Sequence, residues 1–456
     1  MKLLNTVCML PLFLATLVAQ APKSQPIGQP DERLKTDVLL IVAHPDDETG
    51  VSAYLAQLLD QHKRVAAVYL THGEAGHNNM GPERAPSLGA VREMELRHSM
   101  TKFGIDNVWF LGGRDTPSQN VLQSLAAWHH GAALEEVVRM VRLTRPEVII
   151  TWLPGIFIGE NHGDHQAAGV LATEAFDLAG DPSIFPAQLA APVRINETLL
   201  EGLRTWQPKK IYYFTDAQES DPFKNSGPLY PVTGISPARK LPYWQIALEA
   251  FEFHLTQYRS YIEKFAKMDE QQIAKAGADG WADPVQLTFG KSNVGGSATG
   301  DVFESVTLGE IAFVQRSREV VRPPSGLSME LAGPWGFYEI FRPAHGLQHL
   351  PRAAVPEIAI ASGATLQIPL LLRNGTTASH DIALTLASPE GWATEIGAGT
   401  YTVRAGDQLP VLMTSTSPKT AEGPVEEIVC TAKADGQTVS TIKLHVRRRS
   451  GGLPQD

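Results

Sequence analysis

Two short runs of acid–base and metal-binding side chains stand out in this sequence of 456 residues. They are His44-Pro45-Asp46-Asp47-Glu48 and Asn161-His162-Gly163-Asp164-His165. Either run alone has a structural explanation, because one of its polar side chains could cap a helix. Three successive acids exceed what capping needs, however, and capping leaves His44 unexplained. Together the runs offer two imidazoles and a carboxylate, a common catalytic zinc set that leaves positions open for water and substrate.

The first run follows a predicted strand. The apolar stretch from Val38 to Ala43 is apolar on both faces, which is typical of a central strand in a parallel sheet. Because a residue before proline favours extended backbone, Pro45 places His44 at the strand end. The acids then fall on the carboxyl edge, where open α/β sheets bind ligands. The second run likewise follows a predicted strand, one that ends at Trp152.

Alternation of strands and helices predicts an α/β fold, Rossmann-like, with a mostly parallel sheet and helices on both faces. Strands are expected at residues 38–43, 65–70, 108–111, 147–152 and 210–215, and helices at 49–62, 89–103, 134–144 and 165–179. No Gly-x-Gly-x-x-Gly follows the first strand, so dinucleotide binding is disfavoured. Farther along, we expect loops at 216–238, one helix at 244–267, and long loops from 274 to about 346.

The composition changes near Pro351. Seven short strands are predicted at residues 357–361, 365–372, 382–386, 401–403, 411–415, 427–434 and 439–446, with turn signals such as Asn374-Gly375 and Asp435-Gly436 between them. This spacing is typical of a β-sandwich. We therefore predict an α/β domain over 37–346 and an all-β domain over 351–449.

Beside these features, the sequence resembles the PIG-L (LmbE-like) family of zinc-dependent N-deacetylases over about Asp37 to Tyr261. The two runs carry the resemblance, and Ala43 to Glu48 is the specific motif. Further matching pieces are Thr71 to Gly76, Arg92 to Glu95 and His254 to Gln257. The departures are mild: His72 stands where Asn is usual, and Gly163 stands where Pro is common.

The resemblance implies a hydrolytic site. His44, Asp47 and His165 would bind Zn²⁺, with iron or cobalt as alternatives because this donor set accepts several divalent ions. Asp46 would be the general base for attack of a zinc-activated water on the acetamide, and His162 would stabilise the oxyanion. The expected products are acetate and a free amino sugar.

Four other residues are candidates for supporting roles near this site. Asp164 is expected to hold the ring of His162 in position and counts with the catalytic group. Arg92 would bind the substrate, or else pair with a neighbouring glutamate. His72 would line the pocket or be a loop histidine, and His254 would lie near the mouth of the site or in the core.

The all-β segment resembles the Ig-like modules of secreted carbohydrate-active enzymes, with Pro389-Glu390-Gly391-Trp392 as one matching turn. Three interpretations remain open: a glycan-binding module, a spacer, and a partner that shapes the rim of the active site. We favour the last two, because the sequence shows no exposed aromatic platform.

The N-terminus predicts export. Lys2, an apolar stretch from Leu3 to Val18, and Ala19-Gln20-Ala21 form a signal peptide over 1–21, followed by a linker over 22–36. The alternative is an uncleaved anchor, but no later segment is apolar enough to span a bilayer, so the mature chain is expected to lack a membrane span. The protein would then act in the periplasm or outside the cell.

Composition narrows the function classes. The net charge is −10 and no basic tract occurs, which disfavours nucleic acid as a partner. Two cysteines exclude both a disulfide scaffold and a cysteine-built zinc site. We therefore predict an exported zinc N-deacetylase for an N-acetylated amino sugar or glycoconjugate. The alternatives are a metal-dependent amidase or esterase for another acyl group and a non-catalytic glycan-binding protein; the sequence does not determine the oligomeric state.

Overall fold

The structure is a computed structural model that describes residues 30–157, 162–189, 203–218, 220–316, 325–420 and 423–449. The predicted signal peptide and most of the predicted linker lie outside these ranges, as does Asn161 of the second run. No helix within the described ranges is long and apolar enough to cross a membrane.

The first sheet has six strands in the order β3-β2-β1-β4-β5-β8. They are β1 (Val38–Val42), β2 (Val65–Tyr69), β3 (Val108–Phe110), β4 (Val148–Trp152), β5 (Lys210–Phe214) and β8 (Thr288–Ser292). Strands β1 to β5 are parallel and β8 is antiparallel to β5, so the sheet is mixed. Every residue of β1, β2, β4 and β5 is buried, as expected for strands covered on both faces.

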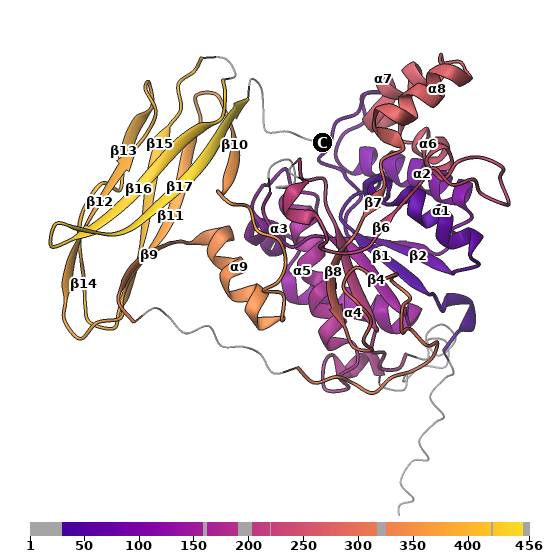
Figure 1. Cartoon of the computed structure of the whole chain (residues 1–456), viewed down its shortest axis with the longest axis horizontal. Helices are drawn as coiled ribbons and strands as arrows, with labels where there is room; N and C mark the ends of the chain where they lie inside the picture. The colour runs from indigo at the N-terminus through magenta and orange to yellow at the C-terminus, as the bar shows by residue number, and fades with distance from the viewer. Residues whose placement is uncertain are drawn as a thin grey trace, which may run out of the picture.

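Helices cover both faces of this sheet. Figure 1 shows α3, α4 and α5 on one side and α1, α2 and α6 on the other. The helices of this part are α1 (Ser52–Asp60), α2 (Pro86–Phe103), α3 (Val121–Ala127), α4 (His130–Thr144), α5 (Gly163–Leu178), α6 (Tyr243–Phe251), α7 (Leu255–Phe265) and α8 (Glu270–Ala276). Short turns of helix are η1 (Glu32–Leu34), η2 (Asp47–Gly50), η3 (Pro186–Leu189), η5 (Asp221–Phe223) and η6 (Gly277–Trp281), and β6 (Leu229–Tyr230) pairs with β7 (Val285–Gln286).

The predicted single helix over 244–267 is wrong, because the chain divides into α6 and α7. His254 separates them with non-helical backbone (φ −82°, ψ 54°), and its side chain is fully buried against Glu48. A contact with a residue two hundred positions earlier therefore interrupts a continuous helical pattern. The helix α3 was not predicted.

The region expected as loops, 274 to about 346, contains further regular structure. Strand β8 extends the first sheet, and β9 (Leu327–Leu331) pairs with β11 (Thr365–Asn374). Helix α9 (Gly333–Ala344) follows β9 and lies between the two parts of the molecule (Figure 1). These elements are stabilised by partners far away in the sequence, which local patterns do not reveal.

All seven predicted C-terminal strands are present. They are β10 (Glu357–Ala361), β11, β12 (His380–Ala387), β14 (Gly399–Val403), β15 (Gln408–Thr416), β16 (Glu426–Ala434) and β17 (Gln437–Arg449), joined by the unpredicted β13 (Ala393–Ile396). Two sheets form, in the orders β10-β17-β16-β12-β14 and β13-β15-β11-β9. Their inner residues, such as Ile368, Met413 and Cys430, share one hydrophobic core. The Ig-like description stays a prediction.

Candidate metal centre

The two runs of the sequence meet at the carboxyl edge of the first sheet. Strands β1 and β4 are parallel neighbours, so the residues after Val42 and after Trp152 emerge side by side. His44 lies two residues after the end of β1, whereas His162 and His165 lie at the beginning of α5. The predicted convergence is therefore present in the structure.

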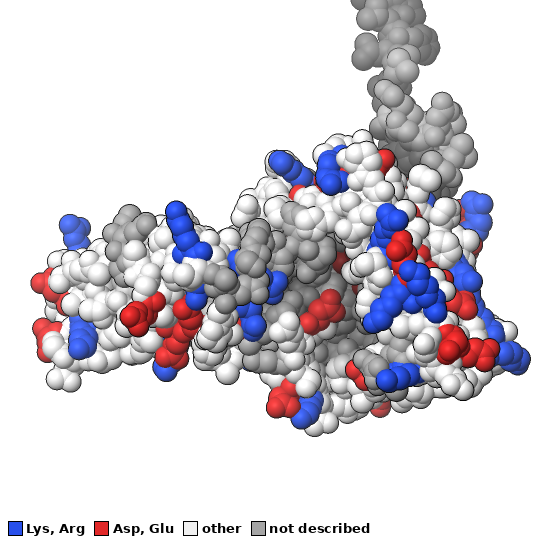
Figure 2. All heavy atoms as spheres, turned by 90° about the horizontal axis from the view of Figure 1, so that it is seen from above, with Lys and Arg blue, Asp and Glu red and all other residues white. Residues whose placement is uncertain are grey.

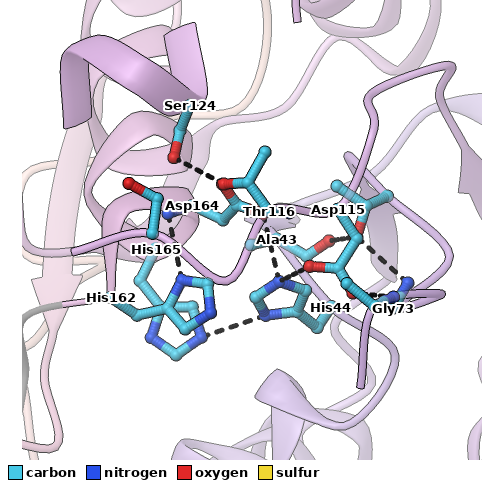
Figure 3. A network of polar contacts seen from close by, with 12 residues as sticks. Ala43, His44, Gly73, Asp115, Thr116, Ser124, His162, Asp164 and His165 are labelled. Carbon is cyan, nitrogen blue, oxygen red and sulfur yellow. Dashed lines mark hydrogen bonds and ion pairs between the residues drawn. The ribbon is translucent and has the colours of Figure 1, made fainter. Parts of the chain in front are cut away.

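His44, Asp47 and His165 form a buried cluster with the spacing of a metal site. One donor atom from each lies within 4.8 Å of the others. His44 Nδ1 is 3.2 Å from His165 Nε2, and Asp47 Oδ1 is 3.3 Å from the same His165 atom and 3.6 Å from His44 Nδ1. Figure 3 shows the two imidazoles turned toward each other. Two nitrogens and one oxygen suit a divalent transition metal.

Asp47 is held by its second carboxylate oxygen. Oδ2 accepts hydrogen bonds from the backbone N–H groups of Ala43 and His44, at 2.8 and 2.9 Å, and from Trp152 Nε1 at 2.6 Å. Burial alone would raise the pKa of Asp47, but His165 and His44 lower it well below its usual range. The carboxylate is therefore ionised, with Oδ1 directed at the two imidazoles.

The other nitrogen of His44 faces carboxylates. His44 Nε2 lies 3.1 Å from Asp115 Oδ1 and 3.5 Å from Asp164 Oδ2. Burial would lower the pKa of His44, but Asp115, followed by Asp164 and Asp47, raises it well above its usual value. A hydrogen bond from Nε2–H to Asp115 leaves Nδ1 as the nitrogen that can bind a metal, the arrangement common for metal-ligating histidines.

Trp152 positions two of the three ligands. Its ring stacks on His165 with centroids 4.0 Å apart and planes inclined by 3°, while its Nε1 donates to Asp47. The side chain is 2% exposed. The last residue of β4 therefore fixes both the carboxylate and the imidazole.

Asp46 lies beside the ligands and pairs with Arg92. Arg92 Nη2 is 3.0 Å from Asp46 Oδ1, and Arg92 Nη1 donates to the carbonyl of Gly73 at 2.8 Å. Gly73 has φ +65°, and a Cβ there would collide with the Arg92 guanidinium, so only glycine suits this position. Both charged residues line the pocket. The ionic partner of Arg92 is therefore Asp46, and not a neighbouring glutamate as the sequence analysis considered.

His162 has one nitrogen fixed. Its Nδ1 accepts the backbone N–H of Asp164 at 3.1 Å, so the neutral ring carries its proton on Nε2 (Figure 3). Burial, followed by the nearby His44 and His165, lowers the pKa of His162 well below its usual value. Without a bound ion, the ring is therefore a neutral hydrogen-bond donor.

Asp164 holds the ring of His162, as expected, but through its backbone N–H rather than through its side chain. Its carboxylate accepts hydrogen bonds from Thr116 N at 2.8 Å and Thr116 Oγ1 at 2.6 Å. Thr116 Oγ1 also contacts Ser124 Oγ at 3.1 Å (Figure 3). Asp164 therefore joins the start of α5 to the loop after β3 and faces His44.

Two predicted substrate contacts lie elsewhere. His72 stacks on Phe110 with centroids 4.7 Å apart and lies 3.3 Å from Glu93, outside the pocket lining. His254 has no exposed surface and its Nε2 is 2.7 Å from Glu48 Oε1. The prediction that His254 lies near the mouth is thus wrong, and the core alternative is confirmed.

A cavity of about 270 Å³ opens onto the cluster. It is lined by His44, Asp46, Asp47, Thr49, Ala75, Gly76, Arg92, Asp115, Pro117, Trp152, His162, His165, Asp216 and Tyr258. The sequence analysis missed Asp115 and Asp216. Both follow parallel strands, β3 and β5, so the rule that found His44 could have found them at the same sheet edge.

Comparison with known proteins identifies relatives of this part. The PIG-L family, described as GlcNAc-PI de-N-acetylase, matches residues 39–176. A 1D-myo-inositol 2-acetamido-2-deoxy-alpha-D-glucopyranoside deacetylase of Streptomyces scabiei is 35% identical over 175 residues, which are 35% of this chain and 54% of that protein. The chain thus spans little more than half the length of this relative.

A second relative is matched over more of its length. The protein named 1D-myo-inositol 2-acetamido-2-deoxy-alpha-D-glucopyranoside deacetylase 2 of Frankia casuarinae is 32% identical over 232 residues, which are 46% of this chain and 70% of that protein. The solved N,N'-diacetylchitobiose deacetylase of Pyrococcus horikoshii has 17% identity and a TM-score of 0.38 over 55% of this chain and 83% of its own, too low a score for a structural conclusion. On the family match and the Frankia relative, the chain belongs to the PIG-L family.

Proposed function

We propose that this chain is a metal-dependent hydrolase that removes the N-acetyl group from an N-acetylated amino sugar or glycoconjugate. The observation that carries the proposal is the buried cluster of His44, Asp47 and His165, with the carboxylate of Asp46 beside it in one pocket. The family supports the reaction class, since its curated relatives are named as deacetylases of an acetamido sugar.

The donor set fits a divalent cation. His44 would bind through Nδ1, Asp47 through Oδ1 and His165 through Nε2, because these atoms face one another while the other atoms of His44 and Asp47 have protein partners. We propose zinc, with iron and cobalt compatible with the same ligands. A bound cation of this kind supplies Lewis acidity, which polarises a carbonyl and lowers the pKa of water.

Asp46 would move the proton. Within the described chain Arg92 is its only ionic partner, and this contact orients the carboxylate at the pocket without engaging a metal ligand. Asp46 would accept a proton from the attacking water and return it to the nitrogen of the amide. The C–N bond then breaks, giving a neutral amine that leaves readily and acetic acid, which loses its proton to water and becomes acetate.

His162 would stabilise the oxygen of the carbonyl. Because Nδ1 accepts a backbone hydrogen bond, Nε2–H is the donor available to the developing negative charge. The low pKa of the free ring favours this neutral donor over the imidazolium form. His162 therefore would bind the oxyanion, and Asp46 would carry the transferred proton.

The place of the reaction is a separate proposal. The charged, apolar and small-residue segments of residues 1–21 form the order expected of a signal peptide, which supports export to the periplasm or beyond. Extracellular glycans and cell-wall fragments would then be the accessible substrates.

The test combines metal analysis with acetate release. The mature protein, Asp46→Asn and the surface control Asp106→Asn are each assayed against a panel of N-acetylated sugars. We expect one equivalent of divalent metal in all three, and acetate release that is lost only in Asp46→Asn. Metal with no acetate from any compound would contradict the deacetylase proposal and direct the search to other acyl groups. Absence of metal from all three proteins would contradict the site itself.

A further inference from the structure

A second cavity lies between the α/β part and the β-rich part. Its volume is about 550 Å³, and its walls come from the loop after β3, the beginning of α9, and strands β10, β11 and β15. Figure 2 shows the narrower β-rich part on the left, joined to the broader α/β part on the right. This interdomain groove contains none of the residues assigned to the reaction.

The groove lies next to the active-site pocket. Pro117, which is exposed, lines both cavities. The next residue, Ser118, lines the groove while its carbonyl accepts the backbone N–H of Gly163 at 2.5 Å, beside the site histidines. A proline at position 163 could not donate this bond, which gives the departure from the family pattern a physical reason. One short segment therefore separates the two cavities, and a ligand that extends past Pro117 enters the groove.

The walls of the groove are fixed to one another. The Gln119 side chain donates to the carbonyl of Ala359 at 3.0 Å and accepts its N–H at 3.2 Å, so it binds the free edge of β10. On α9, Tyr338 Oη donates to Gln166 Oε1 of α5 at 2.8 Å. The groove is therefore a built feature of the interface between the two parts.

The lining suits neutral sugar units. Exposed amide and hydroxyl groups come from Gln123, Thr365 and Gln367, and Trp335 adds a half-buried aromatic side chain. Glu357 is the one charged residue in the described lining, and Arg447 Nε donates to it at 3.1 Å. Because no cation among the described lining residues would attract a phosphate or carboxylate, the chemistry favours uncharged hydroxyl-rich groups beside an apolar surface.

We propose that this groove binds the continuation of the substrate chain, so that the substrate is an N-acetylated oligosaccharide or glycoconjugate and the β-rich part contributes to its recognition. The inference rests on the proposed function for the identity of the reacting sugar. It assigns two lining residues as specificity-determining: Gln123, which lies on α3, and Gln367, which lies on β11.

The test measures binding apart from turnover. In the Asp46→Asn background, calorimetry gives the Kd of N-acetylglucosamine oligomers of one to five sugars for the full chain. Affinity is expected to rise with the length of the oligomer. The double variant Gln123→Ala/Gln367→Ala is expected to bind the longer oligomers about tenfold more weakly and the monosaccharide with unchanged affinity. Gln437→Ala, an exposed glutamine of β17 outside the groove, is the matched control and keeps the full length dependence.

The outcomes separate this inference from the proposed function. Affinity independent of length, equal length dependence in the double variant, or no binding of any oligomer would overturn the groove as a subsite. Length-dependent binding that the double variant loses would support the groove even if the unsubstituted enzyme released no acetate. Absence of acetate release would then contradict only the proposed deacetylase activity.

Discussion

At the scale of single residues, two of the three proposed ligands, His44 and Asp47, have their second polar atom held by a protein partner. His44 directs Nε2 at Asp115, and Asp47 directs Oδ2 at three N–H donors. Such partners fix the tautomer of an imidazole and the orientation of a carboxylate before any ion binds. Asp115 is itself oriented, since its Oδ2 accepts the N–H of Ala75 at 2.7 Å.

Asp115→Asn is expected to weaken metal binding by about 10- to 100-fold. The amide cannot supply the negative charge that draws the proton to His44 Nε2, so the tautomer with Nδ1 free is less favoured. Competition with a chelator measures the affinity, and Asp106→Asn is the exposed control. An unchanged affinity for metal in Asp115→Asn would show that the carboxylate does not position His44.

At the scale of elements, a buried ion pair joins the turn after β1 to the beginning of α7. Glu48 of η2 accepts from His254 Nε2 and also from Tyr69 Oη at 3.1 Å. Burial would lower the pKa of His254, but Glu48 raises it above its usual value. The contact holds the turn that carries Asp46 and Asp47 against the late helices.

His254→Ala is expected to lower the free energy of unfolding by about 3 kcal/mol. The substitution removes the cationic partner of the buried Glu48 carboxylate and leaves it only hydroxyl groups as hydrogen-bond donors. Urea unfolding of the metal-free protein measures the loss. His72→Ala, whose side chain is partly exposed, should change the stability by less than about 0.5 kcal/mol. A raised KM without loss of stability in His254→Ala would instead restore the substrate-binding role expected from the sequence.

A pair between α4 and α5 should make stability depend on pH. His130 Nε2 lies 2.7 Å from Glu174 Oε2, and this hydrogen bond raises the pKa of His130 above its usual 6.5. A histidine whose pKa is higher in the folded than in the unfolded protein contributes its full stabilisation below about pH 6.5. This contribution is lost as the pH rises through the pKa of the folded state. The stability lost in His130→Gln should therefore be larger at about pH 6 than at about pH 8, though below about 1 kcal/mol because the pair is partly exposed.

Unfolding curves at the two pH values measure this difference. His77→Gln, an exposed histidine, is the control and should show the same loss at both. An equal loss at both pH values in His130→Gln would mean that the charge of His130 adds nothing to the contact.

At the scale of the whole molecule, the segment from β9 to the end of α9 belongs to both parts. Met329 lies in the core between the two C-terminal sheets, whereas Tyr338 and Phe341 pack into the core of the first sheet. This shared segment, with the Gln119 contact to β10, gives the interdomain groove its defined walls.

Cys430 reports on the integrity of the β-rich part. Its thiol is fully buried between the sheets, and burial raises its pKa to about 11. Since the thiolate is the reactive form, iodoacetamide at about pH 8 should leave Cys430 unmodified in the native protein and alkylate it in urea. Peptide mapping by mass spectrometry follows the reaction, with free glutathione as the reagent control. Rapid alkylation of the native protein would contradict the closed core.

Features that follow short-range rules could be predicted from the amino-acid sequence. Stretches apolar on both faces predicted the parallel strands, and the carboxyl-edge rule placed both polar runs at the ligand-binding edge of the sheet. The family resemblance then named His44, Asp47 and His165 as the metal ligands, and these three residues do form a cluster. Alternating patterns and turn residues likewise predicted seven C-terminal strands. These signals are contained within a few consecutive residues, and burial of apolar side chains enforces them.

The contacts between side chains of different elements could not be predicted, because they depend on how the elements pack. Three such contacts join residues from different elements. They are the ion pair of Asp46 with Arg92, the hydrogen bond of His44 to Asp115, and the buried contact of His254 with Glu48. Strand β9 and the interdomain groove have the same origin, since each needs a partner that is distant in the chain. Local patterns specify which face of an element is apolar, but the side chain that meets a polar group there depends on how the elements pack.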